Sequence, residues 1–196
     1  KELYSIDPTN EFLNEIGYVE DTNRKTKLPF KMGSMEKDET IEEVKKRFFK
    51  KGLYNTEFII TPKFDGLSFL TNEKTLKAYT RGDGEFGQIS DIHFKTIPNT
   101  VLQNFEYTYG EVIMSRKSFE KYSEDSPNAR NLVAGLTNSN DASSKLKDCD
   151  YVRYGAFNTI HTTKEDLLND LNNDQTIKVK FTKVKFCHLI LNFYTI

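Results

Sequence analysis

The order of its short apolar segments restricts the fold of this chain more than any other feature. Residues 57–64, 66–71 and 75–80 read as strands that follow one another without a helix between them, and Asn72 and Glu73 mark a turn between the last two. A doubly wound parallel sheet needs a helix after each strand. The strands here come in clusters with helices between the clusters. The sequence therefore predicts an α+β fold.

The clearest helix begins after Thr40 and ends at Gly52. Thr40 and Glu43 have the spacing of a capping box, in which each side chain bonds to the backbone N–H of the other residue. Gly52 is typical of the residue that follows a helix. The apolar face of this helix consists of Ile41, Val44, Phe48 and Phe49. Further helices are expected over 115–122, 129–136 and 162–173, and further strands over 107–114, 150–157 and 177–186.

The charges of the chain are nearly balanced. Its 196 residues include 28 Lys and Arg against 29 Asp and Glu, so a net charge of -1 gives no bulk attraction to nucleic acid, although a local basic face remains open. Residues 45–51, KKRFFKK, form one basic cluster, which we expect to be a solvated helix face. The length suits one large domain or two small ones, with a core that needs neither disulfides nor a metal.

Cysteine and histidine usage gives no sign of a metal site. Cys149 and Cys187 form no CxxC pair, so we expect free intracellular thiols. His93, His161 and His188 are scattered, and we expect ordinary surface or partly buried histidines. No apolar run reaches the roughly 20 residues of a membrane span, and no signal peptide is visible. These features predict a soluble, intracellular and cytoplasmic protein without a membrane partner.

The stretch TRGDGEFGQ, residues 80–88, has the glycine spacing G-x-G-x-x-G. In a Rossmann fold this spacing is followed by a long helix whose N-terminus faces the pyrophosphate. The residues that follow here reach Pro98 within a dozen positions, and no HRD or DFG motif of a kinase follows either. On its own the stretch is a weak signal. A glycine-rich turn between strands and a nucleotide-binding turn both remain open.

Lys63 lies in a second suggestive segment, TPKFDG, residues 61–66. One interpretation is a surface lysine beside an Asp-Gly turn, and the other is a nucleophilic lysine. An amine attacks phosphorus only in its unprotonated form, which a nearby cation or desolvation favours. Asp65 suits a metal ion or a polar substrate group, and Gly66 permits close backbone approach.

Taken together, these motifs resemble those of covalent nucleotidyltransferases. KFDG resembles their KxDG motif, and TRGDGEFGQ resembles the TRGDGxxGE motif of NAD-dependent DNA ligases in particular. The order of the motifs is kept over about residues 28–157. The other matching segments are KMGSMEK (31–37), YGEV (109–112, family RGEV), NARNLVAG (128–135, family NPRNAAAG) and VRYGAF (152–157). The chain is thus similar to the adenylation domain of NAD-dependent DNA ligases, in a short, divergent form of viral or phage type.

The resemblance implies a fold and a reaction. The fold is the nucleotidyltransferase fold, α+β with mainly antiparallel sheets and flanking helices. Residues 1–27 are then an irregular or helical lead-in, and residues 28–196 are the adenylation domain without its last motif strands. In the family, a lysine attacks the α-phosphate of NAD, becomes lysyl-AMP, and passes AMP to the 5′-phosphate of a DNA nick in replication and repair.

The resemblance also implies site residues. Lys63 would be the nucleophile, and Asp65 would organise phosphate and Mg²⁺. Binding roles follow for Thr61 beside the adenine, Arg81 at a ribose or phosphate, Glu111 at a ribose hydroxyl, Tyr154 stacked on the adenine, and Arg130 at the nucleotide or the nicked strand. Each has a structural alternative: Tyr154 as a core aromatic, Glu111 as a strand-end acid, Arg130 as a surface charge.

Several positions depart from the family pattern. Thr61 stands where the family usually has a Glu that reads the adenine amino group, which leaves an ATP-dependent DNA or RNA ligase relative open. The family's D-G-V-V-x-K strand and further lysine strand are missing from this sequence, and Lys178, Lys180, Lys183 and Lys185 are candidates for their role by charge only. A third hypothesis is an inactive nucleotide-binding fragment.

These departures also shape the expected partners. Without two phosphate-neutralising lysines, we expect transition-state stabilisation to be weak and strand sealing by this chain alone to fail. We expect weak binding of nicked double-stranded DNA without further domains, and a monomer. A viral protein in a host cell is a second possibility for its location.

Overall fold

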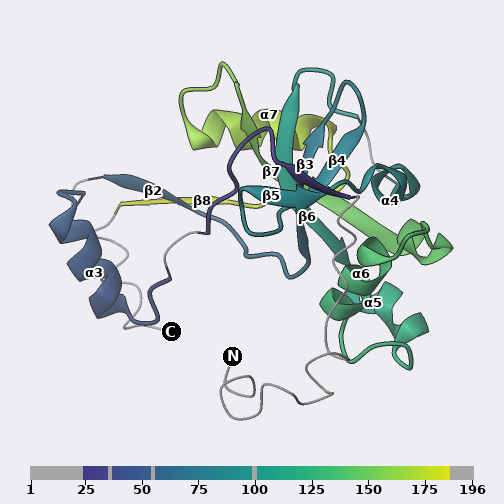
Figure 1. Ribbon diagram of the computed structural model, residues 1–196. Coiled ribbons are helices and arrows are strands. Elements are labelled where there is room, and N and C mark those ends of the chain that lie inside the picture. The colour runs from purple at the N-terminus through teal and green to yellow at the C-terminus, as the bar shows by residue number, and fades with distance from the viewer. Residues whose placement is uncertain (1–23, 35–36, 54–55, 99–100, 186–196) are drawn as a thin grey trace, which may run out of the picture.

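The centre of the fold is a four-stranded antiparallel sheet in the order β4-β3-β6-β7. The computed structural model describes residues 24–34, 37–53, 56–98 and 101–185. Figure 1 shows β3 (Leu67–Asn72), β4 (Lys77–Thr80), β6 (Tyr107–Met114) and β7 (Cys149–Phe157) crossing the middle of the molecule. Every pairing in this sheet is antiparallel. The predicted α+β class with antiparallel sheets is confirmed.

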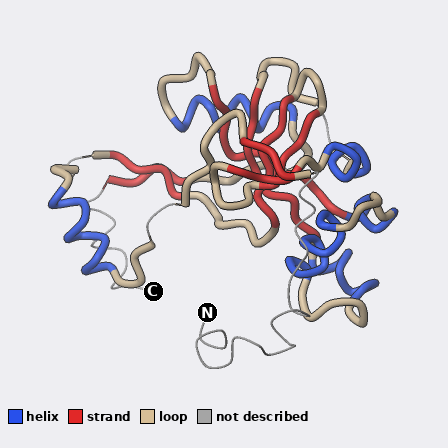
Figure 2. Tube along the Cα trace, in the orientation of Figure 1, coloured by secondary structure: helices blue, strands red, loops and turns tan. Residues whose placement is uncertain are grey.

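Helices flank this sheet (Figure 2). α6 (Ala129–Asn138) and the short α4 (Asp91–Thr96) pack against an apolar cluster that includes Phe69, Val112 and Leu132. α7 (Lys164–Asp174) packs against a second cluster, which includes Val152 and Leu168. Successive strand residues point to opposite faces, so one strand contributes to both clusters. The remaining short helices are α5 (Arg116–Phe119), η1 (Glu120–Tyr122) and η2 (Ser144–Asp148).

Two small ribbons complete the strands. β1 (Lys25–Lys27) pairs with β5 (Phe86–Gln88), and β2 (Glu57–Ile60) pairs with β8 (Thr182–Lys185), both antiparallel. In Figure 1 the β2–β8 ribbon extends to one side of the sheet toward α3 (Ile41–Lys50). Phe48 of α3 meets Phe58 of β2, with ring centroids 4.6 Å apart.

Local signals located most elements well. α3 has the predicted capping box, since Thr40 accepts from the Glu43 backbone and the Glu43 side chain accepts from the Thr40 backbone. Gly52 has a φ of 67°, a left-handed conformation that suits glycine after a helix. The prediction of a strand over 177–186 was wrong in extent, because within the described residues β8 covers only Thr182–Lys185. The prediction of β2 likewise extended too far, since the strand ends at Ile60.

His93 corrects the expectation of surface or partly buried histidines. Its side chain is fully buried, with Nδ1 3.0 Å from the Ser90 hydroxyl oxygen and Nε2 3.0 Å from the Ser139 carbonyl oxygen. Burial, and then the nearby Arg24 guanidinium, lower the pKa of this imidazole. Cys149 is a buried free thiol. Cys187 and His188 lie outside the described residues.

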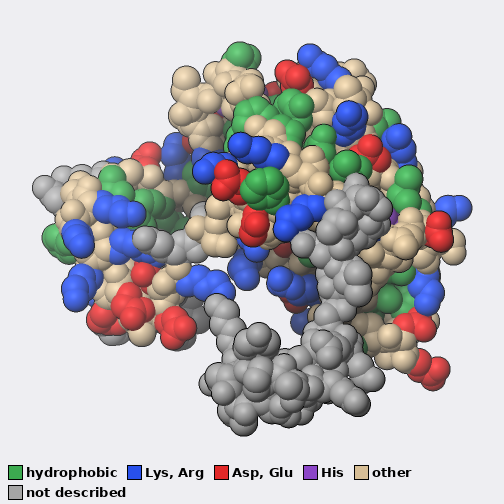
Figure 3. Space-filling view, in the orientation of Figure 1, with side chains coloured by type: hydrophobic (Ala, Val, Ile, Leu, Met, Phe, Trp, Pro, Cys, Tyr) green, Lys and Arg blue, Asp and Glu red, His purple; other side chains and the backbone are tan. Residues whose placement is uncertain are grey.

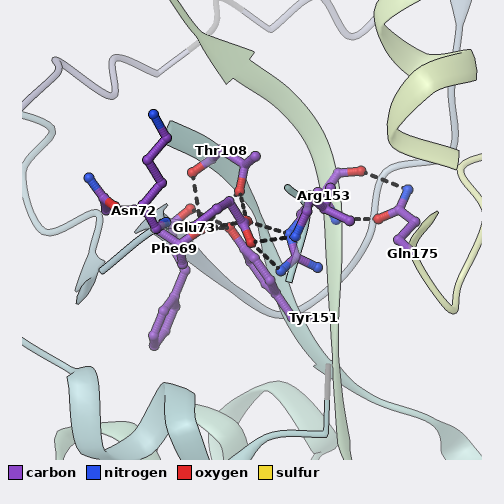
Figure 4. Close-up of polar contacts among 10 residues, drawn as sticks. Phe69, Asn72, Glu73, Thr108, Tyr151, Arg153 and Gln175 are labelled. Atoms are coloured by element: carbon purple, nitrogen blue, oxygen red, sulfur yellow. Dashed lines mark hydrogen bonds and ion pairs between the residues drawn. The ribbon is translucent and has the colours of Figure 1, made fainter. Parts of the chain in front are cut away.

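A buried ion pair joins Glu73, in the turn after β3, to Arg153 of β7 (Figure 4). Arg153 Nε and Nη2 donate to the two carboxylate oxygens of Glu73 at 2.6 and 2.9 Å, and both side chains are only 1% exposed. Thr108 Oγ1 donates to the same carboxylate at 2.5 Å, and the Leu102 backbone N–H donates at 3.1 Å. The Gln175 side chain accepts a hydrogen bond from the Arg153 backbone N–H and donates one to the Arg153 backbone C=O. The predicted turn at Glu73 is confirmed, and the structure adds that this turn residue is buried and anchors Arg153.

Charged side chains of both signs are interspersed over the visible face in Figure 3, as the balanced composition suggests. In the part of the chain that the structure describes, none of the helices has the length and apolar character needed to cross a membrane.

Candidate active site

The loop that carries Lys63 connects β2 to β3. Thr61, Lys63 and Asp65 are exposed, while Phe64 between the last two packs against the buried cluster around Val152 and Leu168. An extended chain places alternate side chains on opposite sides, so an anchored Phe64 directs its two neighbours outward. The structure therefore places the predicted nucleophile in contact with solvent.

Gly66 brings this loop close to the sheet. A Cβ at this position would lie 2.1 Å from the Val112 carbonyl oxygen, so no other residue fits without a shift of the backbone. The expectation that Gly66 permits close approach is confirmed, with the β6 backbone as the partner. The contact holds the start of β3 directly against the strand that carries Glu111.

Glu111, Ser68 and Tyr154 meet across three adjacent strands. Ser68 on β3 pairs with Glu111 on β6, and its hydroxyl donates to Glu111 Oε2 at 2.9 Å. The Tyr154 hydroxyl on β7 donates to the same oxygen at 3.1 Å. Glu111 is 8% exposed. Burial, and then the Glu111 carboxylate, raise the pKa of the Tyr154 hydroxyl, so this group stays protonated and donates.

The Tyr154 ring belongs to the same apolar cluster as Phe64. It is half-buried and meets Tyr109 edge to face, with centroids 5.5 Å apart and planes at 84°. The ammonium of Lys164, at the start of α7, lies 5.8 Å from the Tyr109 ring centroid and donates to the Tyr154 carbonyl. The shared cluster places the Lys63 loop and the Tyr154–Glu111 pair in one region of the molecule.

Asp65 and Arg130 form an exposed ion pair between the Lys63 loop and α6. Arg130 Nη1 lies 3.1 Å from Asp65 Oδ1, and the two side chains are 50% and 78% exposed. Arg130 lies in the first turn of α6, whose N-cap Asn128 accepts from the Asn131 backbone at 2.8 Å. Sequence analysis named both residues but not their contact.

The glycine stretch forms a turn between β4 and β5. Gly82 and Gly84 have φ values of 54° and 98°, conformations that other residues rarely adopt. The Asp83 carboxylate accepts from the backbone N–H groups of Phe86 and Glu85 at 2.7 and 2.9 Å, which hold the pKa of this carboxyl below its usual value. No Rossmann helix follows within these described residues, because α4 has only six residues and starts at Asp91.

A pocket of about 360 Å³ lies beside this turn, and we name it the glycine-turn pocket. It brings together Arg81 and Arg130, two of the predicted site residues, with Ser68, the hydroxyl partner of Glu111. Its lining also includes Lys25, Leu67, Thr80, Gly82, Asp83, Phe86, Gly87, Gln88 and Asn138. Lys63, Glu111 and Tyr154 are not part of this lining.

Sequence reasoning missed Ser68 and Lys25. Ser68 has no motif of its own, and only the β3–β6 register, across 43 positions, places it beside Glu111. Lys25 lies on a three-residue strand, too short for a periodic pattern. Two of the four tail lysines have partners elsewhere: Lys183 is 2.6 Å from Glu165, and Lys178 donates to carbonyls at the end of α7.

The residues fit Mg²⁺ only as a companion of bound phosphate. The described residues contain no group of three or more His, Cys, Asp or Glu side chains placed to hold a metal. Mg²⁺ commonly keeps several waters and takes one or two carboxylates together with substrate phosphates. The exposed carboxylate of Asp65 suits that mode.

The fold and the order of these motifs are those of a nucleotidyltransferase adenylation domain, with antiparallel sheets and flanking helices. The family model for the NAD-dependent DNA ligase adenylation domain matches residues 23–184. The chain belongs to this family, and the resemblance drawn from the sequence is confirmed.

Curated relatives agree with this assignment. The chain is 39% identical over 147 residues to a DNA ligase of Acanthamoeba polyphaga mimivirus, which covers 70% of this chain and 22% of the relative. A DNA ligase of Malacoplasma penetrans is 34% identical over 146 residues, covering 68% and 20%. A putative DNA ligase of Invertebrate iridescent virus 6 is 33% identical over 141 residues, covering 68% and 23%. The chain thus matches about a fifth of the length of these relatives.

Proposed function

We propose that this chain is the adenylate-accepting part of an NAD-dependent DNA ligase, which forms phosphoric ester bonds. Lys63 attacks the α-phosphorus of NAD, a nitrogen–phosphorus bond forms, and the pyrophosphate bond breaks. Nicotinamide mononucleotide leaves with the bond electrons, and the amine loses a proton to solvent. The AMP then passes to the 5′-phosphate of nicked double-stranded DNA, as in replication and repair.

The observation that carries this proposal is the Ser68–Glu111–Tyr154 group beside the Lys63 loop. Two hydroxyl groups donate to Glu111 Oε2 and fix the direction of the carboxylate. A carboxylate has about four acceptor positions, so a ribose hydroxyl is accommodated as a further donor. The half-buried Tyr154 ring supplies an aromatic surface for adenine.

The other predicted residues have supporting roles in this proposal. Asp65 holds the Mg²⁺ that accompanies the phosphates, and Arg81 and Arg130 contact phosphate or ribose oxygens with their planar forks of donors. Thr61 lies on the same exposed loop as Lys63. We propose a monomer that acts inside the cell, either cytoplasmic or as a viral protein in its host.

Mass spectrometry of the protein after incubation with NAD and Mg²⁺ tests the proposal. The wild-type chain should gain one adenylate, and peptide mapping should locate it on Lys63. Lys63→Ala and Lys63→Arg should remain unmodified. Lys77→Ala is the matched control, because Lys77 is an exposed lysine on β4 outside the site. Equal modification of Lys63→Ala would refute the nucleophile.

Thr61 favours a second candidate, an ATP-dependent relative. Its side chain stands where the family usually has a glutamate, and it is exposed beside the nucleophile. The same experiment with ATP in place of NAD decides between the two donors. Adenylation from ATP alone would select the second candidate, and saturable AMP binding without adenylation from either donor would select a binding fragment.

A further inference from the structure

Strand β7 contains one extra residue where it passes the candidate active site. Tyr109 of β6 pairs with Gly155 of β7. The next residue of β6, Gly110, pairs with Arg153, so Tyr154 lies between two consecutive pairs as the extra residue of a β-bulge. A bulge bends its strand and changes the direction of a side chain. The direction of the Tyr154 ring therefore depends on how this bulge is held.

Lys164, the first residue of α7, holds the backbone of the bulge. Its ammonium donates to the Tyr154 carbonyl oxygen. The same ammonium lies 5.8 Å from the centroid of the Tyr109 ring, within the range of a cation–π attraction. A single side chain thus connects the helix both to the bulged residue and to the aromatic neighbour of that residue.

The start of α7 is itself fixed. The Thr163 hydroxyl caps the helix by accepting from the Asp166 backbone N–H at 3.1 Å. Leu168 and Leu171 of the same helix are fully buried. Because the cap and the core fix the helix, only the Lys164 side chain has to be ordered for its two contacts to form.

The Tyr109 ring is confined by the backbone of β7. A Cβ at Gly155 would lie 2.0 Å from Tyr109 Cζ, so the ring lies directly on the strand. The same ring meets Tyr154 edge to face, and a cation that restrains the first ring therefore restrains the second. Position 109 is also where the family motif RGEV has an arginine, so the cation beside this strand comes here from α7.

We propose that Lys164 is a positioning residue, which holds the bulge in β7 and the Tyr109 ring so that Tyr154 faces the adenine of NAD. This inference deepens the proposed function and rests on it, because that function makes Tyr154 the adenine surface. Lys164 acts through the two tyrosines and takes no part in bond formation to phosphorus. Its loss should weaken nucleotide binding and leave the chemical step unchanged.

Single-turnover adenylation at a series of NAD concentrations tests this role. Lys164→Met keeps the apolar stem but removes the charge and the donors. It should raise the half-saturating NAD concentration about tenfold, as expected for one lost charge-assisted hydrogen bond, and leave the maximal rate unchanged. Lys164→Arg keeps both charge and donors and should stay close to wild type. Lys145→Met is the matched control, because Lys145 lies 5.1 Å from the Tyr122 ring centroid, a lysine–tyrosine contact outside the site.

NMR of the nucleotide-free protein with ring-labelled tyrosine gives a measurement that does not depend on adenylation. The Tyr154 ring signal, assigned with Tyr154→Phe, should shift in Lys164→Met. The same signal should stay in place in Lys145→Met, which should shift the Tyr122 signal instead.

The outcomes separate this inference from the proposed function. An unchanged Tyr154 signal in Lys164→Met would overturn the inference, and so would an equal rise in half-saturating NAD for Lys145→Met. A lower maximal rate at an unchanged half-saturating NAD concentration would place Lys164 in the chemical step and overturn its positioning role. Failure of the wild-type chain to accept adenylate would refute the proposed function instead, and the Tyr154 signal would still show whether Lys164 holds the bulge.

Discussion

Glu73–Arg153 and Asp65–Arg130 are both pairs of a carboxylate and a guanidinium, yet they lie in opposite environments. In the first pair each side chain is 1% exposed and further donors surround the carboxylate, whereas in the second pair Arg130 is 50% and Asp65 is 78% exposed. A buried pair is fixed because an unpartnered charge in the core is costly, whereas an exposed pair exchanges readily with water and ions. The contrast divides the molecule into a closed scaffold and an open site.

Arg153→Met should produce the largest effect, because it leaves the Glu73 carboxylate buried without its cation. We expect a loss of about 3–5 kcal/mol in the free energy of unfolding, measured by urea denaturation. Glu73→Leu combined with Arg153→Met should recover much of that loss, since an apolar pair of similar volume removes both charges. A single variant as stable as wild type would show that the pair does not anchor the sheet.

The scaffold was only partly predictable from the sequence. α3, β6 and β7 were located well because their signals are local: a capping box, and runs of strand-forming residues. The Glu73–Arg153 pair joins residues 80 positions apart, and no local pattern distinguishes Glu73 from a solvated turn residue. β1 and β5 could not be predicted, because three residues are too few to show an alternating pattern. These strands are defined by their pairing with each other.

The site shows the same division. Motif spacing named Lys63, Asp65, Arg81, Glu111, Arg130 and Tyr154 as site residues, and their roles stay predictions. The contacts that connect them, Ser68 with Glu111 and Asp65 with Arg130, depend on strand register and helix placement. Strand register depends on long-range pairing, so it could not be predicted from single segments of the sequence.

The buried side of the comparison also predicts alkaline sensitivity. Burial, and then Asp150 and Asp148, raise the pKa of the Cys149 thiol from 9.0 to about 12. The unfolded thiol loses its proton first as the pH rises, so stability present below pH 9 declines until the folded thiol also ionises. Between pH 8 and 10 we expect a loss of about 1.4 kcal/mol from this group, measured by urea denaturation. Cys149→Val should flatten that decline and Asp65→Asn should not. An unchanged slope in Cys149→Val would contradict the assignment.

Two tyrosines on β7 provide a matched test of scaffold against site. The Tyr151 hydroxyl lies 3.2 Å from Thr71 Oγ1 in the core, and the Tyr154 hydroxyl donates to Glu111. Tyr151→Phe should cost about 1 kcal/mol of stability and leave the rate of Lys63 adenylation unchanged. Tyr154→Phe should slow adenylation several-fold, about what one lost hydrogen bond causes, with a smaller effect on stability. The reverse pattern would mean that Tyr151, and not Tyr154, belongs to the active site.

Removal of the exposed pair should have the smallest effect on stability. Asp65→Asn removes the charge that Arg130 contacts but keeps a side chain of the same size, and the free energy of unfolding should change by less than about 1 kcal/mol. Adenylation of Lys63 should nevertheless fall, because Asp65 is the carboxylate proposed to hold Mg²⁺. Raising the Mg²⁺ concentration should partly restore the rate in Asp65→Asn, whereas the same increase should leave Lys63→Ala inactive. A loss of stability as large as that of Arg153→Met would mean that the exposed pair is part of the scaffold, and the division between the two regions would then fail.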